Sequence, residues 1–437
     1  MTSSKRKICQ AVAFALSALA ASAAMAQTPS LLGGGSSLVA PEIQSEISAF
    51  PPADGTATYW PVGAARMQTQ AAFLNNNPTQ FTSITITGGT IVTATASGTV
   101  DFANSDAPLS ASQISAYTSS GGLGVTDGPL IQLPYIVTPI TVPLVHAPTG
   151  TGPTLPNGGT TATVALNDAD LCGIFSGAFT NWNQVTNPDN GSLYPAGAIT
   201  VVYQANNDGT TDLLTAHLQA VCPVPSGTTA VPVTFTVTQN FASLFPSSTP
   251  PSNFVAATGS SGVAASLLAL SGAGVGYLGP DYTNTFLAPS SSPAKTNNLS
   301  VASLYNTTTK ADVVPSYQNA TLAIGAVTVP SGSNESNPSL WVPNASNPTT
   351  GYPISGTSQI ITSQCYATHS DTPTVAASVI DFLTLHYESN VSIINGNGFD
   401  VVPSVYITAI KETFLSNLSG LKLNIGNKSV CGPLAGR

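Results

Sequence analysis

The stretch VVYQANNDGTTDLLT, residues 201–215, combines a β-branched strand, a polar turn and the start of an apolar-periodic helix. A turn of this kind points the unpaired N–H groups of a helix N-terminus into the cleft where the strand ends, and their partial positive charge favours a phosphate or carboxylate. The turn nevertheless contains no Arg or Lys. Gln204, Asn206 and Asp208 stand where cationic side chains would fix an oxyanion. The stretch therefore predicts an anion-binding backbone frame with an unusual set of side chains.

The first 26 residues have the pattern of a cleavable secretory signal. A basic segment, Lys5 to Lys7, precedes an apolar run from Ala11 to Ala24 and a small-x-small site that ends at Ala26. The apolar run is shorter than a membrane-spanning helix needs, and no later segment reaches about 18 uninterrupted apolar residues. We therefore expect an exported chain without a transmembrane segment, located in the periplasm or outside the cell.

The charge of the chain argues against nucleic acid as a partner. The formal net charge is −9, and loss of the three basic residues in the predicted signal would bring it to −12. Binding a phosphate backbone needs clustered Lys and Arg, which this chain lacks. A small molecule is the partner that we expect, whereas a transporter or extracellular protein partner stays open.

The cysteines predict disulfides rather than a metal site. Cys9 lies in the predicted signal, which leaves an even number, and an even count in an oxidising compartment indicates two bonds. No pair has C-x-x-C spacing, and the histidines are scattered, so we expect no metal and no cofactor. Among the three possible connectivities we favour the pairing of sequence neighbours, Cys172 with Cys222 and Cys365 with Cys431.

Strand and helix patterns alternate along the chain, which predicts an α/β fold, and the roughly 410 residues that remain without the predicted signal favour two lobes. We expect residues 27–138 and 352–437 to form one lobe and residues 139–351 the other, because only the regions Ile131 to His146 and around Tyr352 look like crossings. Each lobe would be a mixed sheet flanked by helices. The pattern predicts helices near 41–50, 70–74, 110–119, 166–175, 209–220, 263–270 and 374–387, strands near 84–96, 100–102, 201–204, 231–237 and 352–361, and loops with short strands over 282–350.

Several motifs spread over nearly the whole mature chain resemble one family. They are AAFLNNNPTQF (71–81), VDFANSDAPL (100–109), LCGIFSGAFTNWN (171–183), VVYQANNDGTTDLL (201–214), SNPSLWVP (336–343), GYPISG (351–356) and SQCYA (363–367). Together they look like the DING proteins, phosphate-binding relatives of the binding subunit of phosphate transporters. The four cysteines also fall in the places of that family. The resemblance implies a hinged, two-lobed periplasmic-binding-protein fold that closes on phosphate.

The resemblance also implies which residues hold the ligand. The positions kept in this chain are Ser37, Leu38, Asp106, Gly209 and Thr210. Three positions depart from the family pattern: the hydroxyl of a Gly-rich turn is replaced at Ala64, the Arg by Gln204 and a Ser by Asp208. Arg66 lies in that altered turn and would either supply the lost guanidinium or pair with Asp208 or Asp106 and close an empty site. We therefore expect phosphate to bind weakly or not at all near neutral pH, with Arg66 and the N–H groups of Gly209 and Thr210 supporting any remaining affinity.

Some of these positions have a structural interpretation beside the functional one. Arg66 would then be a solvated loop residue, and Asp208 would cap the helix that begins near Gly209. Asp106 would form a turn ahead of Pro108, although we favour the binding role because the surrounding motif matches. His217, on the helix after the turn, is expected on the helix surface.

No constellation of a nucleophile and a base is visible, and no G-x-S-x-G motif occurs, so the sequence lends no support to an enzyme. We expect a secreted solute-binding protein that takes phosphate or another small anion between its lobes. The alternative is a secreted extracellular or surface protein that keeps the scaffold but has a degenerate binding site.

Overall fold

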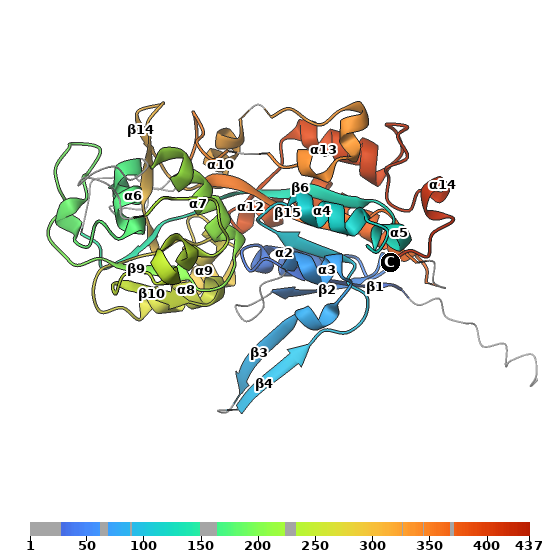
Figure 1. The fold of residues 1–437 in the computed structure, drawn as a ribbon, viewed down its shortest axis with the longest axis horizontal. Helices are drawn as coiled ribbons and strands as arrows, with labels where there is room; N and C mark the ends of the chain where they lie inside the picture. Colours follow the sequence, from blue (N-terminus) through green and yellow to red (C-terminus); the bar gives the residue numbers. More distant parts are fainter. Residues whose placement is uncertain are drawn as a thin grey trace, which may run out of the picture.

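The computed structural model describes residues 28–61, 69–87, 90–148, 164–222, 233–325, 327–343, 345–367 and 371–437. Within these ranges the chain folds around two mixed sheets that lie side by side along the long axis of the molecule (Figure 1). The predicted α/β class is therefore confirmed. None of the described helices is long and apolar enough to cross a membrane.

The larger sheet has six strands in the order β16-β6-β15-β5-β1-β2. Its strands are β1 (Ser30–Gly35), β2 (Thr56–Pro61), β5 (Phe102–Ser105), β6 (Leu130–Pro139), β15 (Ser355–Ser363) and β16 (Asp400–Val401). β1 runs parallel to β2 and β5, whereas β15 is antiparallel to β5 and β6. Every residue of β6 and β15 is buried. Burial on both faces explains why these strands lack the alternation of a half-exposed strand.

The second sheet has five strands in the order β10-β9-β11-β7-β12. They are β7 (Pro143–Val145), β9 (Thr200–Gln204), β10 (Phe254–Ala257), β11 (Gly274–Val275) and β12 (Ser300–Val301). A three-stranded sheet is made of β8 (Ala165–Leu166), β13 (Ser303–Asn306) and β14 (Ala311–Val313). β3 (Thr82–Thr87) and β4 (Thr90–Thr95) form an antiparallel hairpin that projects from the body (Figure 1).

Helices cover both sheets. They are α2 (Ala40–Ala49), α3 (Thr69–Leu74), α4 (Ala111–Thr118), α5 (Gly124–Asp127), α6 (Asp168–Ser176), α7 (Gly209–Val221), α8 (Gly259–Leu268), α9 (Ser292–Asn297), α10 (Tyr317–Ile324), α11 (Val375–Glu388), α12 (Val391–Gly396), α13 (Ser404–Ile410) and α14 (Lys428–Cys431). Local sequence fixes where several begin: Ser110 and Asn167 each form a capping box, at the start of α4 and α6. Such caps satisfy the free N–H groups of the first turn.

The chain passes between the two large sheets at two places that lie next to each other. The Ile140 N–H, just after β6, donates to the Ile354 carbonyl at 2.8 Å, and Thr141 then pairs with Leu278 of the second sheet. Strands of the six-stranded sheet come from residues 30–139 and 355–401, and those of the five-stranded sheet from 143–301. The division into lobes at 138/139 and 351/352 stays a proposal.

Two disulfides join Cys172 to Cys222 and Cys365 to Cys431, the pairing of sequence neighbours that we favoured. The first ties α6 to the end of α7, and the second ties the chain after β15 to α14. On the chain-entropy model each contributes about 4 kcal/mol by restricting the unfolded chain. Such bonds indicate folding in an oxidising compartment.

The structure corrects several sequence-based expectations. No strand is present at 233–237, and the Val237 and Thr238 N–H groups donate to side chains of α7, Gln219 and Thr215, instead of a neighbouring strand. The predicted strand at 84–96 is a hairpin of two strands, and the region 282–350 contains α9 and α10 as well as loops. His217 is buried rather than on the helix surface, since its ring contacts the Ser346 carbonyl and Asp168.

Candidate functional site

The predicted site residues gather where strands of the two sheets end. β1 and β5 are parallel, so the turn after β1, which contains Ser36 and Ser37, lies beside Asp106 at the end of β5. Gly35 permits this approach: its φ is +141°, and a Cβ there would lie 2.1 Å from the Asn104 carbonyl oxygen. From the second sheet, β9 ends at Gln204 and leads into α7. Ends of parallel strands are a common place for ligand sites in open α/β sheets.

Asp106 is held by hydroxyls and touches the start of α7. Its carboxylate accepts hydrogen bonds from Ser36 Oγ at 2.6 Å and from Ser358 Oγ at 2.7 Å. A Cβ added at Gly209 would lie 2.2 Å from the Asp106 Cβ, so only glycine fits at this position. The end of β5 and the first turn of α7 are therefore in direct contact at the site.

Ser37 and Leu38 form a second contact between the sheets. Ser37 Oγ lies 3.1 Å from Ser260 Oγ of α8, and the Leu38 N–H donates to Ser36 Oγ at 3.0 Å. The Leu38 side chain is fully buried and lies close to Gly279. Ser37 and Leu38, two of the positions kept from the family pattern, thus lie in the same turn as Ser36, which binds Asp106.

Asp208 caps α7. Its backbone is extended, and its Oδ1 accepts a hydrogen bond from the Thr210 N–H at 2.8 Å. The structural interpretation of Asp208 is thus correct. Its carboxylate is also buried, and its charge raises the pKa of Asp106. Burial raises the pKa of Asp208, and hydrogen bonds from Thr210, Asn206 and Ser37 oppose the rise.

Some buried polar atoms around the β9–α7 turn have no hydrogen-bond partner among the described residues. They are the two amide atoms of the Gln204 side chain. This side chain is fully buried. Buried polar groups are normally hydrogen-bonded. The free amide donor and acceptor of Gln204 at the end of β9 are therefore available to a bound molecule.

The site is acidic. Burial, followed by the charge of Asp208, raises the pKa of Asp106 to about 7, and the hydroxyls of Ser36 and Ser358 oppose the rise. Burial, followed by the charge of Asp106, also raises the pKa of Asp281 well above its usual range. No Lys or Arg of the described chain forms an ion pair with Asp106, Asp208 or Asp281. Arg66 and Ala64 lie outside the described residues.

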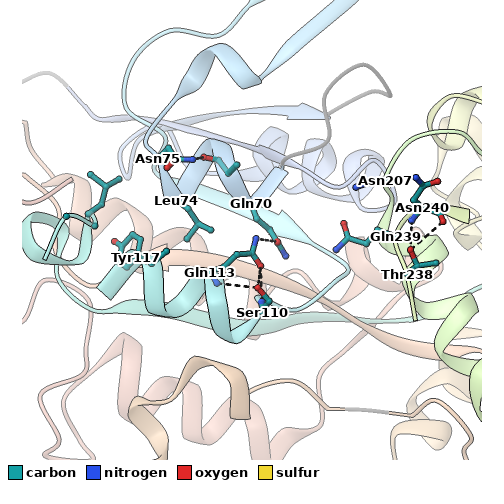
Figure 2. A pocket seen from close by; sticks show the side chains of 15 residues that line it. Gln70, Leu74, Asn75, Ser110, Gln113, Tyr117, Asn207, Thr238, Gln239 and Asn240 are labelled. Atoms are coloured by element: carbon teal, nitrogen blue, oxygen red, sulfur yellow. Dashed lines mark hydrogen bonds between the residues drawn. The ribbon is translucent and has the colours of Figure 1, made fainter. Parts of the chain in front are cut away.

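A groove of about 860 Å³ opens beside the buried site and is lined from both sides of the molecule (Figure 2). Gln70 links its wall to the site, because its Nε2 donates to Ser105 Oγ at 3.0 Å, one residue before Asp106. On the other wall, Asn207 and Gln239 flank Asp208, whose N–H donates to the Gln239 carbonyl. The groove therefore connects solvent with the region of the site.

Sequence reasoning missed two residues that position Asp106. Ser36 belongs to the run Gly33-Gly34-Gly35-Ser36-Ser37, and its hydroxyl rather than that of Ser37 bonds to Asp106. Ser358 lies two residues beyond the GYPISG motif, on β15. Placing Ser358 beside Asp106 requires knowing that β15 pairs with β5, and a strand's own alternation of side chains does not identify its neighbour in the sheet. Local sequence therefore carried no sufficient signal for this contact.

The two sheets with polar residues at their facing strand ends define the fold of the periplasmic solute-binding proteins. Comparison with known proteins supports this class. A PBP superfamily domain matches residues 30–386, and the chain belongs to this superfamily and, within it, to the DING-type phosphate-binding proteins.

Relatives of known structure share the fold over almost the full length. The chain is 33% identical to a high-affinity periplasmic phosphate-binding protein solved with phosphate at pH 8.5, with a TM-score of 0.71, covering 94% of this chain and 99% of that one. It is 30% identical to a phosphate-binding protein from Stenotrophomonas maltophilia, with a TM-score of 0.69 and coverage of 94% and 100%. It is also 32% identical over 440 residues to alkaline phosphatase L of Pseudomonas aeruginosa, with 96% of each chain covered.

Proposed function

We propose that this chain is an exported solute-binding protein that holds a small oxyanion, phosphate foremost, between the ends of β5 and β9. The ligand would lie among Asp106 on one side and Gln204, Gly209 and Thr210 on the other. The names of the relatives support phosphate as the first ligand to test. The affinity for phosphate depends on the side chains around the site and does not follow from the names of the relatives.

The unpartnered polar atoms of the Gln204 side chain are the observation that carries this proposal. Gln204 ends β9, and the turn after it leads into the first turn of α7, where the helix dipole favours an anion. A tetrahedral oxyanion offers several acceptors to such donors. Binding would thus satisfy groups that are otherwise buried without a hydrogen bond, and leaving them unsatisfied costs about 1–3 kcal/mol each.

The carboxylates set the conditions for binding. Asp106, with a pKa of about 7, keeps its proton in mildly acidic solution and loses it as the pH rises. A proton on Asp106 removes a negative charge and supplies a donor to the ligand, whereas its loss adds repulsion in a poorly hydrated site. We therefore propose weak binding at neutral pH and weaker binding at alkaline pH.

Isothermal titration with inorganic phosphate tests the proposal. The double variant Gln204→Arg, Asp208→Ser should bind phosphate at least about 100-fold more tightly than the parent, since a charge-assisted hydrogen bond contributes about 1.5–3 kcal/mol and a carboxylate is removed. Arg66→Ala tests the predicted support from the turn at 63–67, and it should weaken binding by the parent. Lys310→Arg, on an exposed turn, is a matched control that adds a guanidinium away from the site.

A binding-incompetent scaffold is the second candidate, favoured by the buried carboxylates of Asp106, Asp208 and Asp281. For that candidate, neither the parent nor the double variant should bind phosphate at any pH. Sub-micromolar binding by the parent at neutral pH, unaffected by Arg66→Ala, would contradict the weight given to the substituted side chains.

Hydrolysis of p-nitrophenyl phosphate by the parent, lost in Asp106→Asn, would instead support an enzyme such as the name of the Pseudomonas relatives describes.

A further inference from the structure

A second buried cluster lies away from the oxyanion site, between α2 and α11. Glu42 and Glu46 are four residues apart and therefore on one face of α2, and His386 projects from α11. All three side chains are at most 1% exposed. One ligand atom from each lies within 4.8 Å of those of the other two.

The His386 ring is oriented so that one nitrogen faces the cluster. Its Nε2 lies 2.8 Å from the Tyr135 carbonyl oxygen. A carbonyl oxygen only accepts, so Nε2 must carry the proton. Nδ1 then faces Glu46, 3.0 Å from Oε1, while the ring stacks on Tyr135 at a centroid distance of 3.6 Å. Metal-bound histidines are typically fixed in this way by a hydrogen bond from the second nitrogen to a carbonyl.

Glu46 is held in a similar manner. The Tyr135 hydroxyl donates to its Oε2, and the Asn390 amide donates to its Oε1 at 2.9 Å. These contacts fix the carboxylate but leave it able to coordinate a cation, as is usual for ligating carboxylates.

Glu42 differs from the other two residues of the cluster because it lacks hydrogen bonds of good geometry. Its side chain is fully buried, and neither carboxylate oxygen has such a partner among the described residues. Burial, followed by the charge of Glu46, raises the pKa of Glu42 well above its usual range. Buried charges are normally paired or coordinate a metal. A cation at this position would balance both carboxylates.

We propose that Glu42, Glu46 and His386 bind a divalent transition-metal cation, Zn²⁺ or Mn²⁺, that stabilises the packing of α2 against α11. Two carboxylates and a neutral imidazole balance the charge of such an ion. Both oxygens of Glu42, one of Glu46 and Nδ1 of His386 would supply four donor atoms. Carboxylate oxygen and imidazole nitrogen are ligands that these ions accept.

Local sequence motifs do not reveal this site because its residues lie far apart in the sequence. His386 follows Glu46 by 340 positions, and no Cys takes part. The expectation of a chain without metal rested on short Cys and His spacings, which report only ligands that are close in sequence.

Metal content of the full, exported chain is the primary test. Plasma mass spectrometry of protein unfolded with chelator and refolded with Zn²⁺ or Mn²⁺, then dialysed, should find on the order of one ion per chain. The thermal midpoint should exceed that of protein refolded with chelator alone by about 5 °C.

Two variants separate a metal site from an internal cluster that only shares a proton. Glu42→Gln should lose the ion and the metal-dependent shift, whereas Glu388→Gln, on the same helix as His386 and half-exposed beside Lys411, should keep both. Without a metal, Glu42→Gln would replace a protonated carboxyl by a neutral group of similar shape and leave the chain equally or more stable under all conditions. That result, or refolded parent protein that retains neither ion, would overturn the proposal.

Discussion

The two ends of strand β5 place a buried aspartate in very different surroundings. Asp101 precedes the strand and Asp106 follows it, and burial raises the pKa of each to about 7. At Asp101 the Leu32 N–H and the charge of Arg437 oppose this rise. At Asp106 the neighbouring charges are those of Asp208 and Asp212, which add to the rise. One end of the strand thus has a cation nearby, and the other has further carboxylates.

Arg437 serves the first end of the strand as a buried cation. It lies 3.2 Å from Asp127, donates to the Val100 carbonyl at 2.7 Å and to Ser363 Oγ at 2.9 Å, and its guanidinium lies 3.8 Å from the centre of the Phe73 ring. It is the only arginine in the part of the chain that the structure describes. Arg437 thus stabilises the fold at this end of β5. At the opposite end, we expect the stability to depend on protonation of the carboxylates and on a bound ligand.

The largest effect that would test this contrast is expected from Arg437→Met. Removing the cation leaves Asp127 buried without its cationic partner, which typically costs roughly 3–5 kcal/mol. Urea unfolding at pH 7 should show this loss, while Lys428→Met on the exposed side of α14 should change stability little. Equal stability of both variants would mean that the charge at this end of the strand is not structural.

A smaller effect is expected from Asp106→Asn in the dependence of stability on pH. The folded-state pKa of Asp106, about 7, lies above the ordinary value of 3.8. Its stabilising proton therefore contributes fully below pH 3.8, and the contribution is lost as the pH rises through 7, a change of about 4 kcal/mol for this group. Denaturant midpoints between pH 4 and pH 8 should fall for the parent and fall less for Asp106→Asn. Parallel curves for the two proteins would show that Asp106 does not titrate in this range.

The smallest expected effect on stability separates the role of Asp208 as a helix cap from the effect of its charge. Asp208→Ala should lose the cap of α7, at a cost of about 1 kcal/mol, whereas Asp208→Ser keeps a capping oxygen and removes the charge. At pH 8 the serine variant should be at least as stable as the parent, because repulsion with Asp106 is relieved. A serine variant as unstable as the alanine variant would show that the carboxylate itself is needed.

Local patterns and long shared motifs allowed much of the fold to be predicted. The α/β class and the strand, turn and helix at 201–215 followed from local signals, and the family motifs placed Asp106 near Gly209, which it contacts. The contacts of Ser358, Glu42 and His386 join distant segments, which no local period reports. The prediction for His217 was wrong for the same reason, since its buried partners lie on α6 and on the loop after Trp341.

We expect protons on the buried carboxylates to govern oxyanion binding at the end of β5. The decisive measurement is the phosphate affinity of the parent and of Asp106→Asn, each titrated calorimetrically at pH 6 and pH 8. The ratio of the two affinities cancels the titration of phosphate itself. The affinity of the parent relative to Asp106→Asn should fall about tenfold between pH 6 and pH 8, about 1.4 kcal/mol. A ratio that is constant, or that rises with pH, would contradict a role for the Asp106 proton in binding.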